Sequence, residues 1–228
     1  MSYPSEESAM STVIIDESVR IPDSVVDLDS FRKWVYSDDF PEHGKVSFIG
    51  GEVWVEMNAE PLQSHVGLKT KVHATLTRVV NELDLGQFYG DGALWTHRRA
   101  GISNIPDGLF ISWESLETGR VRLLGAPEEA VEVEGSPDMV LEVVSRSSVQ
   151  KDTVFMPDAC WEAGVREYWL VDARGRDLTF KILVRGSRGF RSAPSKAGWH
   201  QSVVFGREFK LERRTARMGL TAYELKVR

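Results

Sequence analysis

Two carboxylates stand out because each lies in a segment that otherwise predicts a buried β-strand. Asp107 follows Pro106 and opens the run DGLFI, and Glu142 interrupts the run MVLEVV. An unpaired charge inside an apolar strand is costly, and two neighbouring carboxylates repel unless something positive lies between them. A divalent cation such as Mg²⁺ meets that need, because it binds carboxylates, a backbone carbonyl and waters. The pattern favours a metal site. The structural alternative for each acid is a salt-bridge partner or a strand end that reaches water.

The helices that would position these acids follow from hydrophobic periodicity. Apolar residues at three- and four-residue spacing predict a helix over 64–86, with Ser64 as its N-cap. A short helix is expected within 27–39, capped by Ser30 or Asp29. Another helix is expected to end near Gly164, which suits the left-handed residue after a helix.

The strands complete the predicted architecture. Two alternating runs around Gly50 and Gly51 predict a hairpin over 45–57. The run 138–145 is continuous and β-branched, which is typical of a central strand. Further strands are expected at 86–97, 103–113, 120–124, 166–173, 178–186 and 199–205, followed by a polar stop. This order predicts an α/β or α+β fold, with helices on the faces of a sheet.

Composition limits the class of protein and the cellular location that we expect. The chain has 228 residues, 42% of them hydrophobic, and a net charge of -6. No apolar run reaches the length of a membrane span, and we expect no secretory signal in the polar, acidic first 20 residues. The single cysteine, Cys160, excludes an intramolecular disulfide framework and favours a cytoplasmic location. Residues 1–25 are interpreted as a flexible lead-in and 26–228 as a single domain.

The ordered motifs resemble a known family. The helix–strand–strand–strand–helix–strand order, with PD on one strand and a carboxylate on the next, is similar to the PD-(D/E)XK nuclease superfamily. Within it, the chain resembles the Uma family of restriction-endonuclease-like proteins. The resemblance spans roughly residues 30–225 and is carried by the motifs GGEVWVEM, SHVGL, NIPDGLFI and PDMVLEVVSRSS…KD…AGVREYWLVD. It implies a restriction-endonuclease-like central mixed sheet flanked by helices, with β-rich N- and C-terminal extensions.

The resemblance also implies roles for particular residues. Asp107 and Glu142 match the two metal-binding acids, and the carbonyl of Val143 matches a further metal ligand. Glu52 and His65 match accessory residues of the family. Asp138 also matches a family acid, but it lies four residues before Glu142 on the same strand. Because that spacing is about 13 Å, Asp138 is interpreted as a residue of the strand start or a turn.

One departure from the superfamily concerns its lysine. The position two residues after the second acid is Val144, and the helix position used by many Uma-like proteins is Met156. Lys151 is the nearest lysine and the candidate for a migrated catalytic lysine, with a solvated surface lysine as the alternative. The implied function is a Mg²⁺- or Mn²⁺-dependent DNA endonuclease that forms a homodimer. The alternative is a catalytically silent nucleic-acid-binding or protein-interaction module.

Overall fold

A six-stranded mixed sheet forms the centre of the part of the chain that the computed structural model describes, namely residues 13–15, 19–41, 44–57, 59–126 and 128–228. Strand β11 is central, parallel to β12 and antiparallel to β8. The order in this main sheet is β14 (Gly189–Ser192), β13 (Thr179–Gly186), β12 (Glu167–Asp172), β11 (Met139–Val143), β8 (Gly108–Ser112) and β5 (Gly86–Tyr89). The predicted mixed sheet and the central position of the MVLEV strand are confirmed.

The main sheet is covered on both faces, which explains the continuous apolar run of β11. Met139, Leu141 and Val143 belong to the core shared with helix α2 (Leu68–Glu82). Val140 and Val144 belong to the core shared with helix α4 (Met156–Glu162). Because side chains alternate along a strand, Glu142 projects toward the α4 side, the same face as Val140 and Val144.

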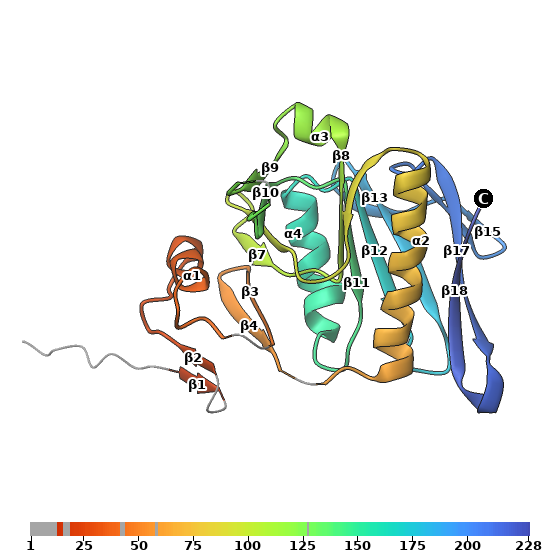
Figure 1. Ribbon diagram of the computed structural model, residues 1–228, viewed down its shortest axis with the longest axis horizontal. Coiled ribbons are helices and arrows are strands. Elements are labelled where there is room, and N and C mark those ends of the chain that lie inside the picture. The colour runs from red at the N-terminus through yellow and green to blue at the C-terminus, as the bar shows by residue number, and fades with distance from the viewer. Residues whose placement is uncertain (1–12, 16–18, 42–43, 58, 127) are drawn as a thin grey trace, which may run out of the picture.

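Each covering helix begins with a short π-helical segment. Segment η1 (Leu62–Gly67) leads into α2, and η2 (Lys151–Phe155) leads into α4 (Figure 1). The prediction of Ser64 as an N-cap is wrong, because the helix begins two residues earlier, after Pro61, which makes no side-chain cap hydrogen bond. Gly164 follows α4 with a φ of +83°, as expected for a residue that ends a helix. None of the helices in the described ranges combines the length and apolar character needed to cross a membrane.

A second sheet lies beside the α4 face of the first. Its order is β4 (Glu52–Glu56), β3 (Lys45–Ile49), β7 (Ile102–Asn104), β6 (Leu94–His97), β10 (Glu132–Gly135) and β9 (Val121–Leu124). The 45–57 hairpin is confirmed as β3 and β4. Helix α3 (Trp113–Glu117) follows β8 and begins at its cap, Ser112.

The runs 86–97 and 103–113 are each divided between the two sheets, which the sequence did not predict. The first run bends at Asp91 and Gly92, which have φ values of +64° and +77°. The second bends near Pro106, which cannot donate to a sheet ladder. The two bends are adjacent, because the Asp91 amide donates to the Asp107 carbonyl at 3.2 Å. The chain therefore changes sheets twice at one place, and Asp107 lies there.

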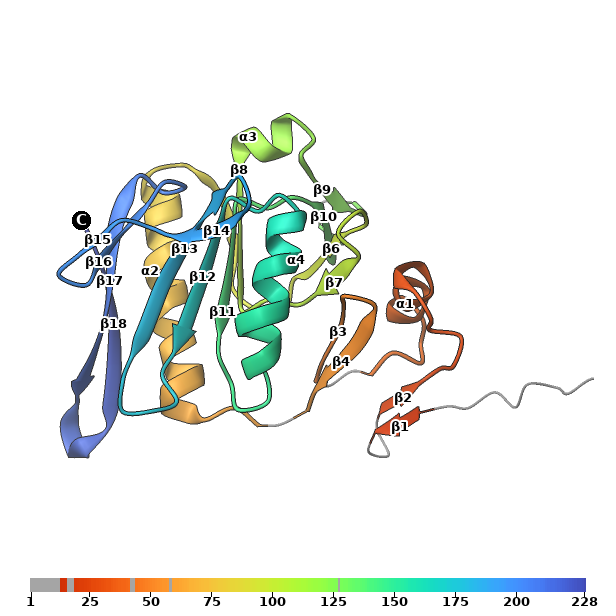
Figure 2. The same ribbon diagram turned by 180° about the vertical axis from the view of Figure 1, so that it is seen from behind.

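The C-terminal region forms a third sheet rather than a polar stop. Its order is β15 (Ser195–Lys196), β16 (Trp199–Ser202), β17 (Arg207–Thr215) and β18 (Thr221–Val227). The residues Phe209, Leu211, Tyr223 and Leu225 are buried against α2, while charged residues alternate with them. Figures 1 and 2 show β17 and β18 standing beside α2. The net polarity of the segment concealed a period-two pattern.

The N-terminal region carries a small helix and a two-stranded ribbon. Helix α1 (Leu28–Val35) is capped by Asp27, whose side chain and that of Ser30 form a reciprocal capping box, so neither Ser30 nor Asp29 is the N-cap. Strands β1 (Val13–Ile15) and β2 (Val19–Ile21) pair antiparallel. Residues 1–12 and 16–18, which make up much of the predicted lead-in, lie outside the described residues.

Candidate functional site

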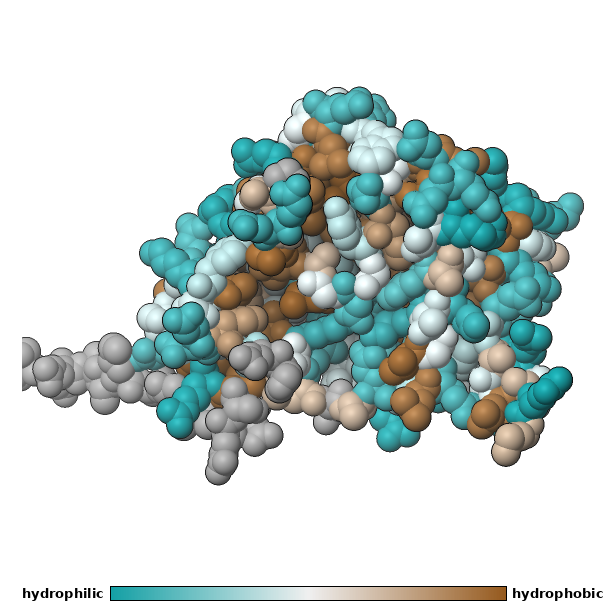
Figure 3. Space-filling view, in the orientation of Figure 1, coloured by the Kyte–Doolittle hydropathy of each residue, from teal (hydrophilic) through white to brown (hydrophobic). Residues whose placement is uncertain are grey.

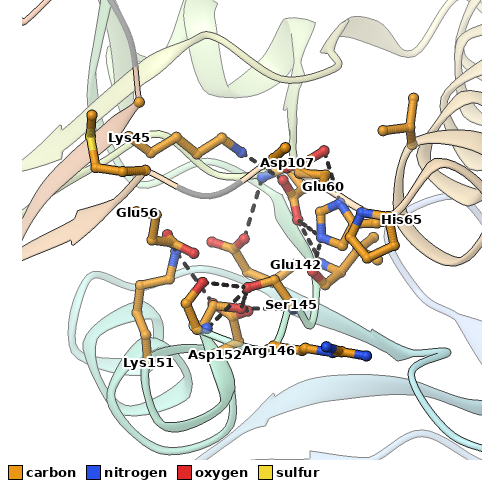
Figure 4. A pocket seen from close by; sticks show the side chains of 18 of the residues that line it. Lys45, Glu56, Glu60, His65, Asp107, Glu142, Ser145, Arg146, Lys151 and Asp152 are labelled. Carbon is orange, nitrogen blue, oxygen red and sulfur yellow. Dashed lines mark hydrogen bonds and ion pairs between the residues drawn. The ribbon is translucent and has the colours of Figure 1, made fainter.

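A cavity of about 1030 Å³ opens at the end of the main sheet where β11 finishes. The β3–β4 hairpin, segment η1, the start of β8, the end of β11 and segment η2 supply its walls. Figure 4 shows Glu142 near its centre, with Asp107 on one side and Lys151 on the other. Asp107, Glu142, Val143, Lys151 and His65, all singled out from the sequence, line this one cavity.

Asp107 is buried and fully engaged through both carboxylate oxygens. Its Oδ2 accepts a hydrogen bond from the Val143 amide at 2.8 Å. Its Oδ1 lies 2.7 Å from Lys45 Nζ and 3.4 Å from Lys69 Nζ. Burial alone would raise the pKa of Asp107, but the two lysines outweigh burial and hold the pKa well below its usual range. Asp107 is therefore a carboxylate that stays ionised.

Glu142 is equally buried but has no direct cation partner among the described residues. Its Oε1 accepts from Asn104 Nδ2 at 3.1 Å, and its Oε2 lies 3.4 Å from the Asp107 amide nitrogen. Burial raises the pKa of Glu142 well above its usual value; Asp152 and Asp107 add to the increase, while Lys151 opposes it. Glu142 thus sits in a place where a further positive charge would stabilise its ionised form.

Lys151 is a buried residue, which rules out the solvated alternative. It opens η2, its side chain is 3% exposed, and its Nζ lies 2.5 Å from Glu56 and 3.4 Å from Asp152. Burial would lower the pKa of Lys151, but Glu142, Asp152 and Glu56 together raise it. The pKa of Asp152 is itself raised to about 6, mainly by burial. The surrounding carboxylates therefore favour the charged form of Lys151 inside the cavity.

A polar stripe on the η1–α2 helix faces Asp107. His65, Lys69 and His73 recur at four-residue spacing and so share one helical face. His65 Nε2 lies 3.9 Å from Asp107 Oδ2, and His73 Nε2 donates to the Asp107 carbonyl at 2.7 Å. Lys69 lies between them and also contacts Asp91 and Glu60. The two histidines are two turns apart and do not form a zinc site. With Lys69 between them, they instead all face Asp107.

The Val143 carbonyl is held by His65. Their separation is 2.6 Å, and since a carbonyl only accepts, His65 Nε2 is the donor. His65 Nδ1 lies 2.9 Å from Glu60 Oε2. Ligand atoms of Glu60, His65 and Asp107 lie within 4.8 Å of one another, which makes this trio a candidate for holding a cation.

Negative charge exceeds positive charge around the cavity. Three lysines face six carboxylates: Glu56, Glu60, Asp91, Asp107, Glu142 and Asp152. Arg146 is exposed at the rim, and its side chain points away from the carboxylates (Figure 4). With every group ionised, about three negative charges have no lysine to balance them, and like charges at close range destabilise one another. The oxygen-rich donor set and this surplus fit a hard divalent cation.

The structure separates two other acids from the cavity. Glu52 lies exposed at the start of β4 and does not line the cavity, whereas Glu56, at the other end of the same strand, does. Asp138 directly precedes β11 and is fully buried. Arg166 and Arg120 lie 3.2 and 3.4 Å from its Oδ1. Asp138 therefore lies at the strand start, as its four-residue distance from Glu142 predicted, and its ion pairs make it a structural acid.

Sequence reasoning missed several residues that line the cavity or contact its acids. The alternation of side chains along β4 was informative only in part. It places Glu52 and Glu56 on the same face of the strand, but it does not say which of the two ends lies at the cavity. The four-residue spacing of Lys69 from His65 was a usable signal. Nothing local marked the remaining missed residues, namely Lys45, Asn104, Glu60 and Asp91.

Comparisons with known proteins concern the fold and the family of the chain. A crystal structure of "a putative nuclease belonging to DUF820 from Anabaena variabilis ATCC 29413" is similar, with a TM-score of 0.57 and 17% identity, over 79% of this chain and 91% of that one. At that identity the likeness concerns the fold. A search of curated protein sequences gives no match. The family described as "Putative restriction endonuclease" matches residues 28–205. Because that match spans most of the sequence, the chain belongs to this family, Uma2.

Proposed function

We propose that the protein is a divalent-metal-dependent DNA endonuclease that hydrolyses phosphodiester bonds. The observation that carries this proposal is the meeting of Asp107 and Glu142 in a cavity whose carboxylates outnumber its lysines. Family membership adds the expectation of a nucleic-acid substrate. A cavity that only bound nucleic acid would gain nothing from such a surplus, because phosphates are themselves anionic.

The cation-binding group in this proposal comprises Asp107, Glu142 and the Val143 carbonyl, with Mg²⁺ or Mn²⁺ as the ion. Such an ion would polarise a phosphate oxygen and lower the pKa of a bound water. His65 and Asn104 act as positioning residues. His65 fixes the Val143 carbonyl, and Asn104 orients the Glu142 carboxylate. This arrangement holds the donors in place before substrate arrives, which is how preorganised sites limit reorganisation during reaction.

Lys151 supplies the ammonium that other superfamily members place elsewhere. Val144 and Met156, the two usual positions, are fully buried in the apolar core shared with α4. Neither can carry a charge to the cavity. Lys151, one turn before Met156, lies on the Glu142 side of the cavity and is held by Glu56 and Asp152. We assign it the stabilisation of negative charge on the scissile phosphate.

A plasmid-nicking assay with Mn²⁺ at low salt tests the proposal. Wild type should nick supercoiled DNA, and Asp107→Asn should not. Lys151→Ala should reduce the rate about 100-fold or more, the scale for losing one electrostatic partner of a transition state. Absence of nicking by wild type with Mg²⁺, Mn²⁺ or Co²⁺ would contradict the proposal. Retained DNA binding would then identify a catalytically silent module.

A matched pair on β4 controls for indirect effects. Glu56 contacts Lys151, whereas Glu52 is exposed on the same face of the same strand. Glu56→Gln should lower the nicking rate because it frees Lys151 from its anchor, and Glu52→Gln should leave the rate unchanged. Equal losses in both variants would mean that β4 acts through the fold and that Lys151 does not depend on its contact with Glu56.

A further inference from the structure

The turn between β17 and β18 projects from the body of the protein. Its tip, Arg217–Gly219, contains Met218 with a φ of +60° and a side chain that is 95% exposed. Leu220 is 51% exposed beside it. A left-handed backbone conformation is unfavourable for methionine, and an exposed methionine gains no packing energy in return. The tip therefore has the features of a contact element that lacks a partner among the described residues.

The same hairpin end carries unbalanced positive charge in an acidic protein. Residues 213–223 contain three arginines and no carboxylate, although the net charge of the chain is -6. Arg213 is used internally, since it donates to the carbonyls of Ala173, Gly175 and Arg176. Arg214 and Arg217 are exposed and form no ion pair with the described residues. Two guanidinium groups thus precede the apolar residues of the tip.

The hairpin tip is tied to the candidate active site. The Thr221 amide donates to Gln63 Oε1 at 2.7 Å, and Gln63 lies in η1 two residues before His65. Figures 1 and 2 show the tip at the same end of the molecule as the loop between β11 and η2. Leu62, 80% exposed on η1, adds apolar surface on this side, and Figure 3 shows brown patches over the lower ends of α2 and the hairpin.

We infer that the β17–β18 turn binds duplex DNA by entering its major groove beside the cavity, an inference that rests on the proposed nuclease function. The major groove of B-form DNA admits a two-stranded β-ribbon, whereas the deep, narrow major groove of A-form RNA does not. Arg214 and Arg217 contact phosphates on the groove walls. Met218 and Leu220 meet the apolar edges of bases, where thymine methyl groups lie.

Fluorescence anisotropy with a 24-base-pair duplex in EDTA tests this inference without requiring cleavage. The Arg214→Ala/Arg217→Ala variant should bind about tenfold more weakly or worse at 50 mM NaCl, and its log–log salt slope should fall by about 1.8, since each lost phosphate contact removes about 0.9. Met218→Ser should weaken binding with an unchanged slope. Arg188→Ala/Arg191→Ala, which removes two exposed arginines of the β13–β14 hairpin, is the control.

These binding measurements test the role of the hairpin independently of phosphodiester cleavage. If both double variants bind like wild type, or if wild type binds no duplex, the inference is overturned, and plasmid nicking still decides the proposed function. If Met218→Ser or the Arg214/Arg217 variant converts a dimer to a monomer in sedimentation while DNA affinity holds, the turn is a contact between copies of the chain. Unchanged melting temperatures confirm that the variants fold.

Discussion

Asp138 and Glu142 lie four residues apart at opposite ends of β11, and both are almost completely buried. At the Asp138 end, Arg120 and Arg166 contact one carboxylate oxygen, and the Ser112 amide donates to the other at 2.8 Å. At the Glu142 end, an amide side chain and a distant backbone amide are the hydrogen-bond donors. One end is neutralised within the fold; the other retains an excess of negative charge.

This difference separates a structural carboxylate from one that we assign to the proposed metal site. Asp138 has two cations for one acid, so burial is offset by ion pairing and hydrogen bonding. Glu142 shares three lysines with five other acids, so its environment favours either a proton or an added cation. Both ends belong to the same apolar strand, and only the partners supplied by other elements distinguish them. Perturbed acids of the second kind mark candidate sites.

The largest expected effect tests the Asp138 end. Asp138→Ala should lower the free energy of unfolding by about 3 kcal/mol, at the low end for breaking a buried ion pair because both arginines can turn toward water. Urea denaturation at pH 7 measures this loss. Glu142→Gln, which removes the charge at the other end, should show no such loss. If Asp138→Ala left the free energy of unfolding unchanged, Asp138 would not be a structural acid and the comparison with Glu142 would fail.

Local patterns predicted strands in both six-stranded sheets because those strands have short-range signatures. The run 138–145 is apolar and β-branched throughout, and Gly50-Gly51 divides two alternating runs, so β11 and the β3–β4 hairpin were predictable. The division of 86–97 and 103–113 between two sheets was not, because it depends on tertiary packing around Asp91 and Pro106. The β17–β18 hairpin was missed because its charged face outweighed its alternation.

The site was predictable where residues lie on regular elements. Glu142 lies within β11, Asp107 directly precedes β8 and His65 lies in η1, and all three line the cavity. The ion pairs of Asp107 were not predictable, because Lys45 is 62 residues away in sequence and its register relative to β8 depends on how two sheets meet. The partners of a buried acid, which decide its role, are long-range contacts.

The next effect concerns metal binding at the Glu142 end. Mn²⁺ at 100 times its Kd should stabilise wild type by about 2.7 kcal/mol, because a ligand that binds only the folded state shifts unfolding by mass action. Differential scanning fluorimetry measures the rise in melting temperature. Asp107→Asn should abolish the rise, while Arg166→Ala, at the Asp138 end, should preserve it. An undiminished rise in Asp107→Asn would exclude Asp107 as a ligand.

A smaller, pH-dependent effect is expected for Glu142 itself. Burial raises its pKa, so the unfolded chain ionises first as pH rises. Stability is therefore complete below the ordinary glutamate pKa of about 4.3 and decreases as pH rises from there toward the folded-state pKa. Glu142→Gln should be equal to wild type at low pH and more stable at pH 8 in EDTA, by on the order of 1 kcal/mol. Urea titrations at both pH values measure the difference, and a loss of stability in the variant at pH 8 would make Glu142 a structural acid.

The smallest effect concerns Lys45, the lysine that forms the shortest ion pair with Asp107. Lys45 Nζ lies 2.7 Å from Asp107 Oδ1, so an incoming cation must compete with it. Lys45→Met should tighten Mn²⁺ binding about threefold, corresponding to a partly exposed ion pair of less than 1 kcal/mol. Lys69→Met should change the affinity less, because Lys69 lies 3.4 Å from Asp107 and has its shorter contacts with Glu60 and Asp91. Isothermal titration of each variant with Mn²⁺ gives the two affinities. Weaker binding in Lys45→Met would mean that Lys45 holds Asp107 in position for the cation. The lysines at the Glu142 end would then organise its acids, much as the arginines at the Asp138 end neutralise Asp138.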